Sequence, residues 1–264
     1  MHRVLITGAA GTLGTILRNG LRGRFQIPRL LDIAPLGAAQ PGEELVSADV
    51  RDLAAMVEAT ADVDAVIHLA GIPDEDSFQR ILDVNMVGTY NVFEAARRQH
   101  AQRVVLASSA HVTGFYPTSQ RIGPDVPPRP DTFYGVGKAF AENLGRLYAD
   151  KHHLEVVCVR IGTVADHPTA LRHLATWLSP RDAVQLFYRC LVAPDVGFTL
   201  CYGNSANLSG WWDTTAAERL GYHPLDNAEQ WAAQLDPTTA GADDPDDGLQ
   251  GGSYTRRRPP GQAG

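Results

Sequence analysis

The chain has 264 residues, of which 44% are hydrophobic and 20% charged, a composition typical of one large globular domain. Its net charge of −7 disfavours a nucleic-acid-binding protein, which normally presents a basic face. Its three cysteines show no metal-ligand spacing and cannot all pair, and no apolar run approaches the roughly 18 residues that span a bilayer, so we expect no metal, no disulfide scaffold and no membrane contact.

The first two-thirds of the chain alternates short apolar runs with longer amphipathic stretches. Strands are expected at residues 4–7, 29–32, 44–47, 65–69, 103–108 and 155–160, and helices at 13–22, 52–59, 78–100 and 133–151. Several strands are continuous runs of Val, Ile and Leu, which is typical of parallel strands covered on both faces. The alternation therefore predicts an α/β fold with a doubly wound parallel sheet. Because the first strand begins almost at once, we expect no signal peptide and a cytoplasmic protein.

The rhythm changes after residue 160. A helix is expected at 180–191, a short strand at 198–202 and a second helix at 214–220. We interpret residues 161–235 as a small substrate-binding cap, integrated with the sheet and covering its carboxyl edge. Residues 236–264 carry acidic, glycine-rich and arginine-rich stretches, so we expect a loose tail. Within it, Tyr254 is a candidate to fold back toward a site of this or another subunit.

A glycine-rich segment follows the first strand and opens the first helix. Gly8, Gly11 and Gly14 permit a tight turn, and the helix N-terminus presents N–H groups to a pyrophosphate. Asp32 ends the second strand, where its carboxylate can accept hydrogen bonds from ribose hydroxyls and repels a 2′-phosphate. A plain glycine turn and a plain turn aspartate are the alternatives. Together these residues favour NAD over NADP and make residues 1–160 a Rossmann-type NAD-binding domain.

Tyr134 and Lys138 lie four residues apart at the start of an expected helix, so they share one face. A tyrosine has an ordinary pKa of about 10, and a nearby ammonium lowers it toward the range of a useful base. Ser109 ends the fifth strand, at the sheet edge where ligands bind in such folds, and can orient a substrate oxygen. An unrelated pair on a helix surface is the alternative, but the phosphate loop and Asp32 favour catalysis.

These residues resemble the extended short-chain dehydrogenase/reductase superfamily over nearly the whole chain. Further motifs are Asp49-Val50, His68-Leu69-Ala70-Gly71 and Asp83-Val84-Asn85. The resemblance implies that Tyr134 is the base, Lys138 its modulator and Ser109 a helper. It implies the cofactor contacts Gly8, Gly11, Thr12, Leu13, Asp32, Ile33, Asp49, Val50, Leu69, Ala70, Gly71, Asn85, Lys138 and Ile161. It also implies a homodimer or higher homo-oligomer through the two long helices.

The resemblance narrows to the NAD-dependent uronate dehydrogenases. It is carried by residues 30–36, 123–127, 174–177, 210–213 and 250–252. Members of that family oxidise the C1 hydroxyl of pyranose D-glucuronate or D-galacturonate to an aldarolactone. The resemblance implies the substrate contacts Ser109, His111, Tyr134, Thr163 and Arg172. Independently, a guanidinium such as that of Arg172 can hold a sugar carboxylate through two parallel hydrogen bonds, although a surface ion pair is the alternative.

Two positions depart from the family pattern. Ala110 stands where the family has asparagine, and Pro73 where it has serine, so two polar sugar contacts are missing. An alternative function is therefore open, a related epimerase or dehydrogenase acting on a different sugar, nucleoside or nucleotide-sugar. A dinucleotide-sensing protein without turnover is disfavoured, because such proteins commonly lose the Tyr/Lys pair.

Overall fold

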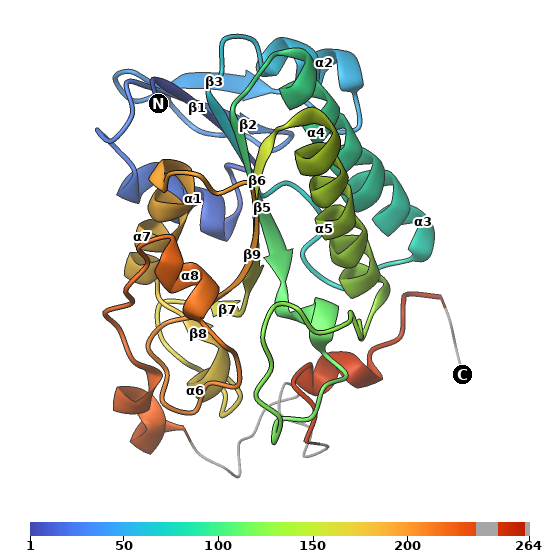
Figure 1. The fold of residues 1–264 in the computed structure, drawn as a ribbon, viewed down its shortest axis with the longest axis vertical. Coiled ribbons are helices and arrows are strands. Elements are labelled where there is room, and N and C mark those ends of the chain that lie inside the picture. The colour runs from blue at the N-terminus through green and yellow to red at the C-terminus, as the bar shows by residue number, and fades with distance from the viewer. Residues whose placement is uncertain (236–247, 262–264) are drawn as a thin grey trace.

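The computed structural model describes residues 1–235 and 248–261, which form a parallel sheet flanked by helices on both faces (Figure 1). The strands are β1 (Arg3–Thr7), β2 (Ile27–Asp32), β3 (Glu44–Ser47), β4 (Ala65–His68), β5 (Arg103–Ser109), β6 (Glu155–Ile161) and β9 (Phe198–Gly203). Their order across the sheet is β3-β2-β1-β4-β5-β6-β9, and every pairing is parallel. The order reverses direction at β1, which confirms the doubly wound α/β fold.

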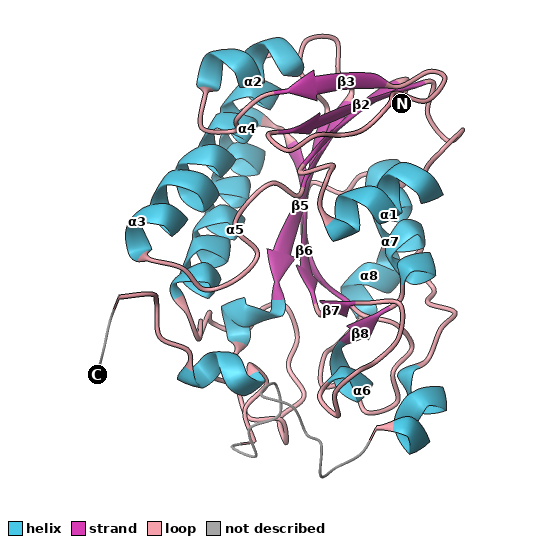
Figure 2. Ribbon diagram, turned by 180° about the vertical axis from the view of Figure 1, so that it is seen from behind, coloured by secondary structure: helices cyan, strands magenta, loops and turns pink. Residues whose placement is uncertain are grey.

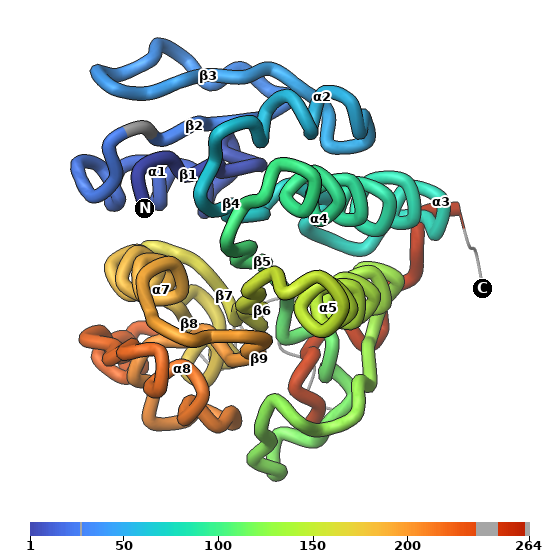
Figure 3. The backbone as a smooth tube through the Cα atoms, turned by 45° about the horizontal axis from the view of Figure 1, so that its top comes forward, coloured from blue at the N-terminus to red at the C-terminus, as the bar shows by residue number. Residues whose placement is uncertain are grey.

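Helices cover each face of the sheet. They are α1 (Thr12–Gly20), α7 (Pro180–Val192) and α8 (Thr215–Arg219) on one face, and α2 (Leu53–Ala59), α3 (Phe78–Arg80), α4 (Gly88–Arg98) and α5 (Phe133–His152) on the other. Figure 3 shows α4 and α5 side by side, across the sheet from α1 and α7. The expected helix at 78–100 is interrupted, because residues Ile81–Val87 between α3 and α4 form a π-helix.

Two apolar cores hold the layers together, one on each face of the sheet. Along β1, Val4 and Ile6 pack in the core under α1 and α7, whereas Leu5 packs in the core under α2, α4 and α5. This alternation follows from the period of two residues along a strand. Full burial of each such side chain stabilises the fold by roughly 1.5–3 kcal/mol relative to exposure. Both faces of the strand must therefore be apolar, which explains the unbroken Val/Ile/Leu runs.

Polar residues define where the helices begin. The Thr132 hydroxyl accepts a hydrogen bond from Gly135 N at 3.0 Å, so α5 starts at Phe133. The Ser179 hydroxyl accepts from Asp182 N at 3.0 Å, and Pro180 fills the first helical position of α7. Each cap satisfies a backbone donor that has no partner inside its helix. Because Thr132 caps α5, Tyr134 lies in its first turn, at the carboxyl edge of the sheet.

Residues 161–235 divide between the sheet layer and its edge. The helix α7 and strand β9 complete the main layers, whereas β7 (Thr163–Val164), α6 (His173–Thr176) and β8 (Trp177–Leu178) lie beyond the carboxyl ends of the strands (Figure 2). Buried Asp182 on α7 accepts hydrogen bonds from Leu225 N and Asp226 N, at 2.8 and 3.0 Å. The following segment is thereby tied to the main layer.

The chain end differs from the expected loose tail where the structure describes it. Residues 248–257 pack beside the loop after β5: Gln250 N donates to Tyr116 O and Gly251 N to Gly114 O, each at 2.8 Å. The Gln250 side chain is 2% exposed. A polar, glycine-rich composition gave no signal of these contacts because they are made to residues far away in the sequence. Residues 236–247 and 262–264 lie outside the described residues, so the expectation stays a prediction for them.

No helix within the described residues is both long and apolar enough to cross a membrane. The three cysteines, Cys158, Cys190 and Cys201, are buried free thiols.

Candidate active site

Ser109, Tyr134 and Lys138 come together at the carboxyl edge of the sheet, as their spacing predicts. Ser109 is the last residue of β5, and its side chain lies close enough to that of Tyr134 to lower the pKa of the phenol. One helical turn after Tyr134, Lys138 Nζ lies 5.6 Å from the tyrosine ring centre and donates a hydrogen bond to Ala107 O at 2.7 Å. A backbone carbonyl of β5 thus holds Lys138, and the Ser109 hydroxyl at the end of the same strand lies beside Tyr134. This arrangement suits proton transfer to or from an oxygen bound between Ser109 and Tyr134.

Burial opposes the charged forms of both titratable groups. It raises the pKa of Tyr134 to about 12, while the Ser109 side chain acts in the opposite direction. It lowers the pKa of Lys138 to about 8, and the charge of Glu142 opposes that shift. Near neutral pH the protein therefore carries a neutral phenol beside an ammonium. Any added positive charge at this point favours the phenolate.

Glu75 is a site residue that sequence reasoning missed. It lies in the loop after β4, and its Oε2 accepts a hydrogen bond from Tyr134 N at 2.9 Å. A carboxylate at a helix N-terminus is favourable because it satisfies a free N–H and faces the positive end of the helix dipole. Nothing in the local sequence connects Glu75 with Tyr134, since 59 positions separate them.

His111 lies in the 3-10 turn after β5 and is held in one orientation. Its Nδ1 is 2.7 Å from Oδ2 of Asp131, a buried carboxylate, and its backbone N–H donates to Ser109 Oγ at 3.2 Å. With Nδ1 directed at Asp131, Nε2 is the ring nitrogen left to contact a ligand. The ring lies edge-on to that of Tyr134, with 6.0 Å between centres. The imidazole is therefore held in one orientation close to Tyr134, where its Nε2 can hydrogen-bond a ligand.

Thr163 and Arg172 form a second group beyond the carboxyl edge. Thr163 Oγ1 lies 3.0 Å from Thr176 Oγ1, and Arg172 Nε donates to Gln250 O at 2.8 Å. The Arg172 guanidinium lies 6.0 Å from the ring centre of Trp211. Arg172 is thus tied to the C-terminal segment through this nitrogen. Sequence reasoning did not foresee this link.

The glycine-rich loop after β1 has the shape of a dinucleotide cradle. Gly8 has φ +72°, and a Cβ there would lie 2.6 Å from Ala70 N, so only glycine fits. Gly11 is the N-cap of α1, and Thr12 and Leu13 form its first turn. The first N–H groups of this helix have no partner inside it and point to the carboxyl edge. The loop therefore leaves room and donors for a pyrophosphate.

Asp32 lies beside this loop at the end of β2. Its Oδ2 accepts a hydrogen bond from Ala10 N and its Oδ1 from Ala34 N, both at 2.9 Å. Each oxygen keeps capacity for a further donor, such as a ribose hydroxyl. Ile33, the next residue, is 72% exposed and offers an apolar surface next to the carboxylate. Both residues fit an adenosine group.

Asp49 and Val50 follow β3 and differ in environment. Arg51 binds the Asp49 carboxylate at 2.6 Å, and this contact lowers the pKa of Asp49. Val50 is buried, and its carbonyl accepts a hydrogen bond from Asn91 Nδ2 at 3.0 Å. Asp49 is therefore a fixed anion at the edge of the cradle, and Val50 contributes packing.

The remaining predicted cofactor residues lie along the same edge. Leu69 follows β4 and Ile161 ends β6, and both pack partly buried against the core. Asn85 Oδ1 accepts from Ile72 N at 2.8 Å, and its Nδ2 donates to Ile72 O at 3.0 Å. Asn85 therefore fixes the loop at Gly71 and Ile72, while its position on the π-helix turns the amide toward that loop. The residues present fit a dinucleotide.

A buried histidine connects the cradle with this loop. His68 Nδ1 is 2.8 Å from Thr7 Oγ1, His68 Nε2 is 3.0 Å from Thr89 Oγ1, and Thr89 donates to Asn85 O. Burial lowers the pKa of His68 to about 3, so the ring is neutral. Because Thr89 donates onward, His68 carries its proton on Nε2. Sequence reasoning used His68 only as part of a motif.

Ala110 and Pro73, the two residues that differ from the family pattern, lie in different environments. Ala110 is buried in an apolar cluster with Tyr116, Ile122 and Trp212. Methyl packing therefore takes the place of an amide there. Pro73, by contrast, is exposed in the loop after β4, directly after Ile72, and has no backbone N–H to donate.

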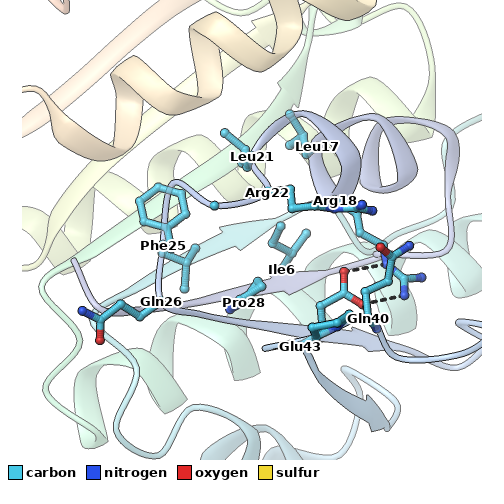
Figure 4. A pocket seen from close by; sticks show the side chains of 13 residues that line it. Ile6, Leu17, Arg18, Leu21, Arg22, Phe25, Gln26, Pro28, Gln40 and Glu43 are labelled. Atoms are coloured by element: carbon cyan, nitrogen blue, oxygen red, sulfur yellow. Dashed lines mark hydrogen bonds and ion pairs between the residues drawn. The ribbon is translucent and has the colours of Figure 1, made fainter.

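A cavity of about 230 Å³ lies away from these residues, between α1 and the sheet (Figure 4). Ile6, Leu17 and Leu21 contribute apolar walls, and Arg18 binds Glu43 through two hydrogen bonds at its margin. Among the described residues, those predicted for the site do not line it. Nor do the described residues include a group of three or more His, Cys, Asp or Glu side chains arranged to hold a metal ion.

Comparison with known proteins agrees with this geometry. The profile of the NAD dependent epimerase/dehydratase family matches residues 4–193. Uronate dehydrogenase from Pseudomonas putida is 43% identical over 255 residues, covering 96% of this chain and 95% of that protein.

Two solved structures share the fold at similar identity. One is a mutant uronate dehydrogenase from Agrobacterium tumefaciens complexed with NAD, at 43% identity and a TM-score of 0.93, covering 98% of each chain. The other is a glucuronic acid dehydrogenase from Chromohalobacter salexigens, at 42% identity and a TM-score of 0.94, covering 99% of each chain. The dinucleotide cradle, the Ser109–Tyr134–Lys138 group and these matches lead to one conclusion: the chain belongs to the NAD dependent epimerase/dehydratase family.

Proposed function

We propose that this protein is an NAD-dependent dehydrogenase that oxidises the C1 hydroxyl of a pyranose hexuronate, D-glucuronate or D-galacturonate, to an aldarolactone. The observation that carries the proposal is the meeting of Ser109, at the end of β5, with Tyr134 and Lys138 in the first turns of α5, on the sheet edge that also holds the dinucleotide cradle. Relatives named uronate dehydrogenase, at over 40% identity along nearly the full chain, support the choice of substrate.

The protein's own residues supply binding, orientation and proton transfer. Gly8 and the N-terminus of α1 would hold the pyrophosphate of NAD, and Asp32 the adenosine ribose. NAD, when bound, supplies the hydride acceptor and a positive charge that favours the Tyr134 phenolate. Tyr134 removes the C1 hydroxyl proton, and Ser109 donates a hydrogen bond to the same oxygen. Lys138 supplies a cation 5.6 Å from the tyrosine ring and so stabilises the phenolate.

The substrate side of the site recognises a sugar acid. The guanidinium of Arg172 would bind the carboxylate, which lies far from the reacting carbon in a hexuronate. His111, with Nδ1 directed to Asp131, would accept a hydrogen bond from a sugar hydroxyl through Nε2. Thr163 keeps a hydroxyl at the mouth of the site. Together these groups would determine which end of the sugar reaches Tyr134.

The test is NADH formation by the purified protein with NAD and each uronate or its neutral parent sugar. We expect rapid reduction of NAD with the uronates alone. Tightly retained NAD without net NADH would favour an epimerase instead. Turnover of a neutral sugar, nucleoside or nucleotide-sugar in preference to uronates would assign the altered pocket at Ala110 and Pro73 to a different substrate.

We further propose that the protein forms a homodimer, or a higher homo-oligomer, through α4 and α5 and resides in the cytoplasm. These neighbouring helices expose the apolar side chains of Tyr90, Val136, Phe140 and Leu147. A second copy of the same surface would bury them. Sedimentation of the wild type and of Phe140→Glu tests the assembly, and a monomeric wild type would contradict it.

The proposed location in the cytoplasm is supported by the cysteines. The three free thiols suit a reducing compartment.

A further inference from the structure

The loop after β4 and the C-terminal segment meet beside the catalytic group. Arg257, near the described end of the chain, forms an ion pair with Asp74 in this loop. The Tyr254 hydroxyl also hydrogen-bonds the Asp74 carboxylate. The loop continues to Glu75, which binds the backbone of Tyr134. One short loop therefore contacts both the catalytic helix and the other end of the chain.

Tyr254 lies between this ion pair and the site. Its ring stacks on His111, with 3.9 Å between ring centres and 26° between planes. The Arg257 guanidinium lies 3.7 Å from the centre of the Tyr254 ring, a close cation–π contact. Asp74, Arg257 and Tyr254 thus form one unit, which we call the clasp. The clasp rests on the imidazole that faces the catalytic tyrosine.

The contacts of the C-terminal segment at Gln250 and at Arg257 differ in burial. At Gln250 the attachment is buried: the side chain donates to Pro117 O and Gln120 O and accepts from Trp212 Nε1, at 2.9–3.0 Å. At the other end the side chains of Arg257 and Asp74 are 33% and 51% exposed. Exposed ion pairs contribute little to stability, so this end opens at lower cost than the Gln250 end.

We propose that Asp74 and Arg257 are positioning residues for the uronate: their ion pair holds Tyr254 against His111 and so forms one wall of the sugar site. This inference rests on the proposed function. The clasp acts on the sugar through Tyr254, whose ring stacks on His111, a predicted substrate contact, and not on a predicted cofactor residue. Loss of either partner raises KM for the uronate and leaves kcat and NAD affinity close to wild type.

The charges of the clasp allow a sharp distinction between positioning and simple electrostatics. Arg257→Gln leaves a carboxylate near an anionic substrate, whereas Asp74→Asn leaves a cation. Under positioning, both variants raise the uronate KM by about two- to fivefold, the range of an exposed ion pair. Under electrostatics alone, Arg257→Gln raises KM and Asp74→Asn lowers it. Opposite changes, or no change in either variant, would overturn the proposal.

Three further variants complete the test. The double variant Asp74→Asn/Arg257→Gln should be no worse than either single variant, because the two act through one contact. Tyr254→Ala should raise KM more than Tyr254→Phe, which keeps the ring stack and loses only the hydrogen bond. Arg146→Gln is the matched control, since Arg146 forms an exposed ion pair with Asp150 on α5. A KM change in this control equal to that in Arg257→Gln would contradict the proposal.

Hydrogen exchange tests the clasp without any turnover. The amides of Tyr254 and Arg257 donate to Gly251 O and Tyr254 O, whereas that of Gln250 donates to Tyr116 O. Arg257→Gln and Asp74→Asn should speed exchange at residues 254 and 257 and leave that of Gln250 unchanged. Unchanged exchange at all three would refute the clasp. If the wild type forms no NADH with uronates, but the two variants show the faster exchange at residues 254 and 257, only the proposed function is refuted.

Discussion

Replacement of Arg172 tests how the protein recognises a sugar acid. Arg172 is partly buried at the N-cap of α6, and its Nε already donates to Gln250 O. A guanidinium so fixed has little conformational freedom left to lose when it binds a carboxylate. Arg172→Ala removes the cation and its donors, whereas Arg172→Lys keeps the charge and loses the forked geometry.

The expected magnitude follows from the contact that is lost. A hydrogen bond to a charged group contributes about 1.5–3 kcal/mol, which corresponds to roughly a ten- to hundredfold change in an equilibrium constant. We therefore expect Arg172→Ala to lower kcat/KM for uronates by roughly that factor. A neutral sugar has no carboxylate to bind. The kcat/KM for a neutral sugar should decrease only by the smaller effect of losing the contact with Gln250. For uronates, the kcat/KM of Arg172→Lys should lie between those of wild type and Arg172→Ala.

Steady-state NADH formation against sugar concentration, at saturating NAD, provides the measurement. The decisive quantity is the ratio of kcat/KM for D-galacturonate to that for D-galactose in each variant. Because release of Gln250 affects both sugars, the ratio isolates the carboxylate contact. An unchanged ratio in Arg172→Ala, with both sugars equally impaired, would refute the assignment of Arg172 to the carboxylate.

Three other predictions concern the base and the buried polar groups. Tyr134→Phe should abolish turnover and leave NAD affinity intact by calorimetry; loss of NAD binding would contradict the base assignment. His68 has a pKa of about 3 when folded, below its ordinary value of about 6.5, so its stabilisation is full above pH 6.5 and lost as pH falls toward 3. Between pH 6.5 and about 4.5 this costs on the order of 2 kcal/mol, and His68→Gln should flatten the acid limb of urea-unfolding curves; an unchanged limb would contradict it. Arg160→Met strands the buried Glu142 carboxylate and should lower the free energy of unfolding by about 3–5 kcal/mol, with Arg160→Met/Glu142→Gln less destabilised; equal loss in both would argue against the pair.

The sheet and the meeting of Ser109, Tyr134 and Lys138 at its edge could be predicted because their signals are local. Continuous apolar runs mark buried parallel strands, and four-residue spacing brings Tyr134 and Lys138 onto one helix face. Ser109 followed from the rule that ligands bind at the carboxyl ends of strands. The π-helix at Ile81–Val87 could not be predicted, because its amphipathic pattern continues that of the flanking α-helix.

The contacts of the C-terminal segment and of Glu75 could not be predicted from the sequence, because their partners lie far away along the chain. Gln250 is bonded to carbonyls 130 and 133 positions earlier, and Arg257 to a carboxylate 183 positions earlier. Such partners depend on how the whole chain folds, whereas composition reports only a polar, glycine-rich stretch. Ala110 shows the same limit: its apolar cluster includes Tyr116, Ile122 and Trp212, which a local pattern does not connect.

We assign Tyr134, with Ser109 and Lys138, to removal of the C1 hydroxyl proton of a hexuronate whose hydride passes to NAD. The most direct measurement is NADH formation by wild type and Tyr134→Phe with D-glucuronate, D-galacturonate, D-glucose and D-galactose. We expect rapid NADH formation by the wild type with the two uronates only, and none by the variant. Wild-type turnover of the neutral sugars at equal efficiency, or undiminished uronate oxidation by Tyr134→Phe, would contradict it.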